Sequence, residues 1–130
     1  MRVLRQPEST VILRWLDTKT LEVTFEGKLA NPSMDFVVKN FWIEAGERVP
    51  TYALFDCTGV TNFTASIHAA SMRFLAEFKS KGGREILAVV TMAPLRMFGQ
   101  ALVFGSGLPL KLFSSRDAAV TYLVRRLREQ

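Results

Sequence analysis

Cysteine and histidine are nearly absent from this chain, since each occurs once among its 130 residues. The single cysteine, Cys57, cannot form an internal disulfide, which is typical of proteins from a reducing compartment. Together with the single histidine, His68, it supplies too few soft ligands for a zinc site. The composition therefore gives no reason to expect a metal or another cofactor.

Long apolar segments are also missing. The first ten residues contain two arginines and no apolar stretch long enough for a signal peptide. The longest uncharged run, Met97–Leu110, is interrupted by three glycines and a proline and is too short to cross a bilayer. With 48% hydrophobic and 22% charged residues, the composition is that of a globular protein. We expect a cytoplasmic protein without a membrane partner, forming one domain over residues 1–130 with a core at about 10–127.

No concentrated stripe of positive charge accompanies the net charge of +5. The seventeen lysines and arginines are spread along the chain, and the tight cluster is Arg125, Arg126 and Arg128 at the end of the last expected helix. Cations at that position complement the helix dipole, and no aromatic side chains are interleaved for base stacking. We therefore expect no nucleic-acid partner.

Two adjacent segments near the N-terminus have strand patterns. Val11–Leu16 is a plausible first strand, and Thr20–Leu29 alternates between two faces. One face carries Leu21, Val23 and Phe25, and the other, expected to be solvated, carries Glu22, Thr24 and Glu26. A turn at 17–19 would join the two strands as an antiparallel hairpin, with a bulge or exit at Gly27.

The remaining apolar patterns predict alternating helices and strands. In chain order these are a helix capped by Asn31 or Ser33 and ending at 45–46, a buried strand Tyr52–Phe55, a helix from about Thr64 to Ser80, a buried strand Ile86–Val90, a helix from Pro94 through Phe104, a strand Leu110–Phe113 and a last helix capped by Ser114 or Ser115. A hairpin followed by alternating α/β units predicts an α/β domain. Its mixed sheet would have four to five strands and be packed with about four helices.

The functional site is expected where the central strand, Tyr52–Phe55, leads to the following helix. Small and polar residues at 56–59 predict a turn after the strand, and a second turn cluster at 61–64 is expected to open the helix. Functional groups often gather where a strand leads to a helix N-terminus. The expected partner-binding edge comprises Asp56, Thr58, Gly59, Thr61, Asn62, Thr64 and His68, with the Met92–Pro94 turn nearby.

Over about residues 10–127, and most strongly from Tyr52 onward, the sequence resembles the STAS domain family. This family includes bacterial anti-sigma factor antagonists and cytoplasmic tails of sulfate transporters. The segment Asp56-Cys57-Thr58-Gly59-Val60 is similar to the family's Asp-x-Ser-Gly-Val-like turn. Ala88–Val90, Pro94–Arg96 and Leu112-Phe113 followed by Ala118-Ala119 are closer to its SpoIIAA-like branch. The resemblance implies a SpoIIAA-like fold and a non-enzymatic regulatory module, whose partner would be an anti-sigma factor or a serine kinase-like regulator.

A phosphorylation site is the further implication of this resemblance. Phosphorylatable members carry a segment like Asp-Ser-Ser-Gly at the start of the next helix, and the matching positions here are Thr64, Ala65, Ser66 and Ile67. Only Ser66 retains the hydroxyl at the position that family kinases phosphorylate. A phosphate in a first helical turn would be favoured by the helix dipole. The alternative is an unmodified polar residue in that turn.

Two other functions start from different residues. A hydrolase would need Cys57 or Ser66 in hydrogen-bond contact with His68, but Ser66 and His68 are two residues apart on the expected helix and point in different directions. We therefore expect no catalytic residues and no enzyme.

The segment Met92–Gly107 is apolar on more than one side. Leu95, Phe98 and Leu102 are expected to face inward, with Met97 as a further candidate. The surplus apolar surface could be covered by the core, by a homodimer partner, which we prefer, or by a ligand. The last option makes a binding module for a small apolar or lipid-like ligand the alternative function.

Overall fold

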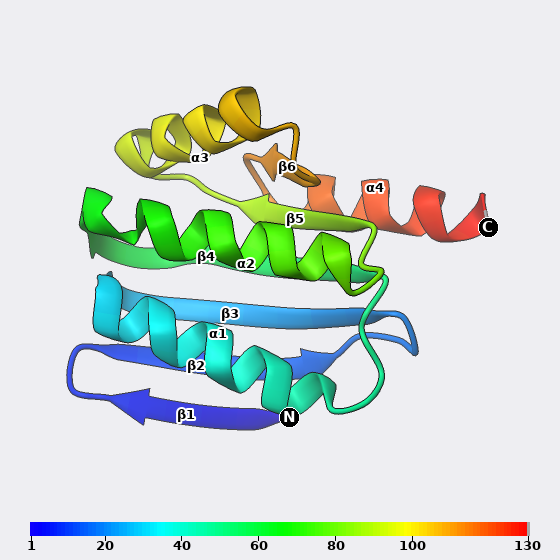
Figure 1. Ribbon diagram of the computed structural model, residues 1–130, viewed down its shortest axis with the longest axis horizontal. Helices are drawn as coiled ribbons and strands as arrows, with labels where there is room; N and C mark the ends of the chain where they lie inside the picture. Colours follow the sequence, from blue (N-terminus) through cyan, green and yellow to red (C-terminus); the bar gives the residue numbers. More distant parts are fainter. Residues whose placement is uncertain (130) are drawn as a thin grey trace.

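The computed structural model describes residues 1–129, with side chains at all of these positions except 105 and 106 (Figure 1). Its strands are β1 (Arg2–Gln6), β2 (Ser9–Trp15), β3 (Thr20–Leu29), β4 (Tyr52–Phe63), β5 (Glu85–Val89) and β6 (Leu110–Phe113). Its helices are α1 (Asn31–Ala45), the 3₁₀ helix η1 (Ala65–Ile67), α2 (His68–Ser80), α3 (Ala93–Ser106) and α4 (Arg116–Arg128).

The six strands form one mixed sheet in the order β1-β2-β3-β4-β5-β6. β1, β2 and β3 pair antiparallel, whereas β3, β4, β5 and β6 pair parallel. The α/β class, the hairpin of β2 with β3, and the parallel later strands are therefore confirmed. β3 and β6 have the predicted bounds, and the predicted bulge is present, because the β3–β4 register shifts beside Gly27.

β1 is the strand that the sequence pattern did not reveal, and it extends the structured region to the N-terminal side of residue 10. Its five residues carry Arg2 and Arg5 and form an edge of the sheet, paired with β2 alone. Edge strands tolerate charge, so their alternation is weak in sequence.

The helices cover both faces of the sheet (Figure 1). Buried side chains of α1, α2 and α3 form one hydrophobic cluster with Leu21, Val23 and Ala53 of the sheet. Tyr52 and Leu54 point to the opposite face, where they pack with Ala119 and Leu123 of α4. Each predicted helix therefore packs on the sheet, three helices on one face and one on the other.

The prediction that Glu22 lies on a solvated face of β3 is wrong. Its side chain is buried, with 4% exposed, and its carboxylate accepts hydrogen bonds from Arg14 at 2.7 Å and from Arg116 at 2.9–3.0 Å. Arg116 begins α4, so the helix that covers this face also supplies a charge partner. A carboxylate can be buried when it is paired in this way.

Helix caps were predicted in part. The N-cap of α1 is Ala30, not Asn31 or Ser33, and the Ser33 hydroxyl accepts a hydrogen bond from the Ala30 N–H at 2.8 Å. Ser33 thus performs the reciprocal half of a capping box from the third helical position. At α4, Ser115 is the cap, and its hydroxyl accepts from the Ala118 N–H at 3.1 Å.

Candidate functional site

The central strand does not end where the sequence predicted. β4 runs for twelve residues, through the predicted turn at 56–59 and on to Phe63. Two register shifts against β3 accommodate the extra residues. The first lies between the pairs Thr24–Asp56 and Glu26–Gly59, and the second follows the pair Gly27–Val60. The small polar residues therefore lie at bulges within a continuous strand. A bulge adds a residue to one strand without reversing the direction of the chain. The predicted turn is therefore wrong.

β4 has a sheet neighbour on one side only after Asp56. Its pairing with β5 ends at Asp56 opposite Val89, whereas its pairing with β3 continues to Phe63. Asp56 Oδ1 accepts hydrogen bonds from the Thr58 N–H at 3.1 Å and from Thr58 Oγ1 at 2.7 Å. Asn62 Oδ1 accepts from the Phe63 N–H at 2.8 Å. Two predicted edge residues thus satisfy main-chain donors of this extension.

Gly59 serves the packing of the extended strand on β3. A Cβ atom at this position would lie 2.8 Å from Glu26 Cγ and 3.2 Å from the Phe25 carbonyl oxygen. Its role is therefore close approach between two strands, whereas the sequence suggested a turn.

The segment around Ser66 is the 3₁₀ helix η1, which leads directly into α2 at His68. Thr64 is the N-cap of η1, so the predicted helical start at about Thr64 is confirmed, although the first turn is 3₁₀ and not α-helical. The Thr64 N–H donates to the Leu29 carbonyl at 3.0 Å, which ties the turn to the end of β3. The hydroxyls of Thr64 and Ser66 lie 2.7 Å apart in a hydrogen bond. Ser66 is exposed, and the adjacent Ile67 is buried in the core.

The structure places the predicted edge residues along one stretch, which we call the β4–α2 segment (residues 56–68). Thr58, Thr61, Asn62, Ser66 and His68 are exposed. Asp56, Gly59 and Thr64 are partly buried. The His68 ring meets Phe98 of α3 edge-on, with 6.0 Å between ring centroids. Helix α3, which follows the Met92 turn, therefore borders the segment.

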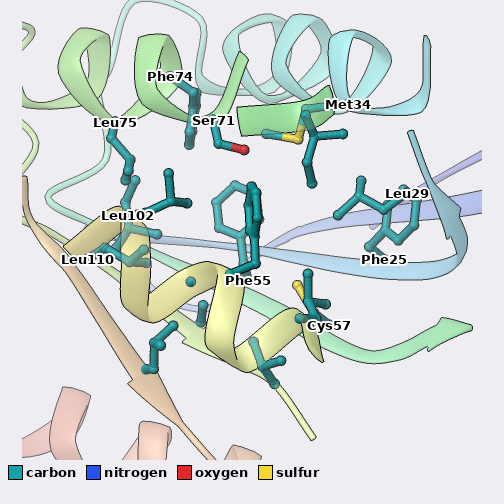
Figure 2. Close-up of a pocket in the computed structure, with 18 of the residues that line it drawn as sticks. Phe25, Leu29, Met34, Phe55, Cys57, Ser71, Phe74, Leu75, Leu102 and Leu110 are labelled. Atoms are coloured by element: carbon teal, nitrogen blue, oxygen red, sulfur yellow. The ribbon is translucent and has the colours of Figure 1, made fainter. Parts of the chain in front are cut away.

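The side chains considered for catalysis do not come together. Cys57 faces an apolar cavity (Figure 2), and burial, with a smaller contribution from the Asp56 charge, raises the pKa of its thiol to about 12. Such a thiol is protonated at neutral pH and is a weak nucleophile. Within residues 1–129, no hydrogen bond joins His68 to Cys57 or Ser66. The same residues contain no group of three or more His, Cys, Asp or Glu side chains placed to hold a metal ion.

Helix α3 is apolar on its outer side as well as its inner side. Leu95 and Leu102 are buried and Phe98 is partly buried, in agreement with the predicted inner face. The prediction that Met97 also faces inward is wrong, because this side chain is 68% exposed. Phe104 is likewise exposed, at 91%. Of the helices in the described part of the chain, none combines the length and apolar character required to cross a membrane.

An apolar cavity of about 110 Å³ lies between α2, α3 and the sheet. Leu95, Phe98 and Leu102 of its lining belong to the segment for which the sequence left an apolar ligand open, whereas the lining residues of β4 and α2 were not identified. The cavity's sequence signal was the inward stripe of α2, where Ser71 stands among apolar residues.

No protein-family model and no curated protein sequence matches this chain. Solved structures do match. The unphosphorylated anti-sigma factor antagonist SpoIIAA has a TM-score of 0.66 at 13% identity, over 88% of this chain and 97% of that one. An anti-sigma factor antagonist from Mycobacterium paratuberculosis has a TM-score of 0.58 at 15% identity, covering 92% and 97%.

A third similar structure is an uncharacterised protein from Shewanella loihica PV-4 that is described as having a SpoIIAA-like fold. Its TM-score is 0.58 at 16% identity, over 89% of this chain and 94% of that one. Similarity at this level of identity concerns the path of the backbone. Together with the β-hairpin, the parallel strands and the helices on both faces of the sheet, it shows that this chain has a SpoIIAA-like fold.

Proposed function

We propose that this chain is a non-enzymatic regulatory module of the bacterial cytoplasm that binds a protein partner through the β4–α2 segment. An anti-sigma factor or a serine kinase-like regulator is the partner class, since proteins of the same fold are anti-sigma factor antagonists. The observation that carries the proposal is the row of exposed polar side chains that ends at the exposed Ser66 hydroxyl. Exposed side chains along one segment can be contacted by a partner without unfolding of the domain.

Phosphorylation of Ser66 is the proposed switch. A phosphate would add nearly two negative charges and three acceptor oxygens to the segment. Thr64 Oγ1 already lies 2.7 Å from Ser66 Oγ and offers one hydroxyl donor to the modified side chain. Added charge at the centre of a docking surface either recruits a basic partner or repels an acidic one. A related precedent is the SpoIIAA of Bacillus, which has been solved in a phosphorylated form with a TM-score of 0.64 to this chain.

Affinity capture with three immobilised proteins tests the proposal: the wild type, Ser66→Glu and the control Ser80→Glu. Ser80 is an exposed serine at the opposite end of α2, so its variant carries the same charge change away from the segment. We expect at least one bacterial protein to bind the wild type and Ser80→Glu equally. Its affinity for Ser66→Glu should change by about tenfold or more when measured with the purified partner. If no captured protein distinguishes Ser66→Glu from Ser80→Glu, the proposal is wrong.

A further inference from the structure

An apolar cavity of about 110 Å³, open toward the surface, lies between the sheet and helices α2 and α3 (Figure 2). Phe55 and Cys57 of β4 form part of its floor, and Leu102 of α3 forms part of its roof. An engineered protein cavity of about 150 Å³ with a similar lining stays dry and binds benzene. The cavity of this chain is therefore close to the size of one aromatic ring.

The lining contains no charged side chain. Apart from the Cys57 thiol and the Ser71 hydroxyl, every lining residue is glycine or carries a hydrocarbon or thioether side chain. Burial keeps the thiol neutral by raising its pKa to about 12. An ionic ligand would lose its hydration here without gaining a counter-charge, so the occupant must be neutral.

Ser71 contributes the one hydroxyl among the residues that line the cavity. It is 8% exposed, and Figure 2 shows its hydroxyl directed inward among the lining side chains. It makes no hydrogen bond to any residue that the structure describes. Buried hydroxyls are normally satisfied, and a serine inside a helix can bond to a main-chain carbonyl of the preceding turn. An unsatisfied hydroxyl facing an apolar space is the complement of a ligand with one polar atom.

Helix α3 forms one wall of the cavity. Its N-cap, Met92, provides no side-chain cap, and its first turn has no acidic residue. Gly99 lies inside the helix, where glycine lowers helix stability, and it faces the Leu112 side chain of β6. Since the cavity is open toward the surface, entry of a ligand requires no unfolding of this helix.

We propose that this cavity is a binding site for a small neutral molecule, an aromatic ring or a short branched alkyl group that bears one hydroxyl or carbonyl oxygen. The hydrocarbon part fills the space between Phe55 and Leu102, and the oxygen pairs with Ser71 Oγ. This inference goes beyond the proposed function, because the site lies in the core and its test involves no protein partner.

Titration with benzene and phenol, followed by methyl and amide NMR spectra, tests the site in the intact chain. We expect the wild type to bind both probes with shifts centred on Leu102 and Ser71, and phenol about fivefold or more tightly than benzene. Ser71→Ala keeps the cavity but removes the hydroxyl, so it should bind both probes equally. Ser71→Leu fills the cavity and should weaken both by at least tenfold.

The matched control is Ser80→Leu, the same substitution at an exposed position of the same helix, and it should bind as the wild type does. Wild-type shifts confined to residues outside the cavity, or an absence of shifts at millimolar benzene, would overturn the proposal whether or not Ser71→Leu folds. So would unchanged phenol preference in Ser71→Ala. Because the titration involves no protein partner, failure here leaves the protein-binding proposal intact.

Discussion

Tyr122 illustrates how one side chain can attach a helix to the sheet. Its hydroxyl donates to the two oxygens of Glu85 at 2.7 and 2.9 Å, and Arg126 Nε donates to the same carboxylate at 3.1 Å. Glu85 begins β5, so these bonds join α4 to the sheet. Burial, then the hydrogen bond and charge of Glu85, raise the pKa of Tyr122 to about 12.

The pKa of Tyr122 predicts an alkaline loss of stability. An unfolded tyrosine titrates near pH 10, so the folded state binds the proton more tightly than the unfolded state does. The resulting contribution to stability is complete below about pH 10 and is lost as the pH rises through about 12. We expect Tyr122→Phe to be less stable than the wild type by about 1 kcal/mol at pH 8, with a difference that shrinks toward pH 12.

Urea unfolding of the two proteins at a series of pH values from 8 to about 12 measures this difference. All other titrating groups are common to both proteins, so the difference between the two curves isolates Tyr122. A difference that stays constant across the series would show that the ionisation of Tyr122 is not linked to folding.

Residue patterns in the sequence located individual side chains well where the partners are local. Ser115 was one of two predicted caps because its acceptor role involves the residue three positions later. Glu22 was misplaced in solvent because one of its partners, Arg116, is 94 residues away. No periodicity within a strand reports such a partner. Ser71 presents the same difficulty, since its position on the inward stripe was visible but the space in front of it was not.

The strands show which signals in the sequence determine an element. β3 and β6 have their predicted bounds because alternation or a short apolar run is bracketed by turn residues. β4 was predicted to end at Phe55, yet it continues to Phe63. Glycine, threonine and aspartate favour turns and bulges alike, and only the pairing with β3 decides between them. The edge residues were therefore predicted in the correct region but in the wrong local structure.

Gly59 provides the test of this bulged pairing. We expect Gly59→Ala to lower the free energy of unfolding by about 1–3 kcal/mol, because the new methyl group would meet Glu26 Cγ at 2.8 Å and the Phe25 carbonyl oxygen at 3.2 Å. The matched control is Thr61→Ala, at an exposed position of the same strand, where a change within about 0.5 kcal/mol is expected.

A second variant identifies the cause of the destabilisation. Glu26→Ala removes the closest atom, Cγ, so the double variant should recover part of the loss, as judged from a double-mutant cycle in urea. If Gly59→Ala is as stable as Thr61→Ala, the strands do not approach as closely as the structure has them.

At the scale of the whole molecule, the predicted homodimer depends on the exposed apolar side of α3. Met97 and Phe104 are seven residues apart, so they lie on the same side of the helix, two turns from each other. The sequence predicted surplus apolar surface in this segment and a homodimer as its preferred cover, and the exposed Met97 and Phe104 supply such a surface. The homodimer stays a prediction, and exposed apolar side chains of this size commonly mark contact sites.

Sedimentation velocity over a concentration series tests the homodimer. The wild type should sediment increasingly as a dimer as concentration rises, and a Met97→Gln, Phe104→Ser double variant should remain monomeric with an unchanged fold. The control is Ile43→Ser, which removes another exposed apolar side chain, 53% exposed, from α1. Since Ile43 lies on a different helix, its variant should dimerise as the wild type does. A wild type that is monomeric at all concentrations, or a double variant that still dimerises, would exclude α3 as a dimer contact and leave its outer side available to another protein.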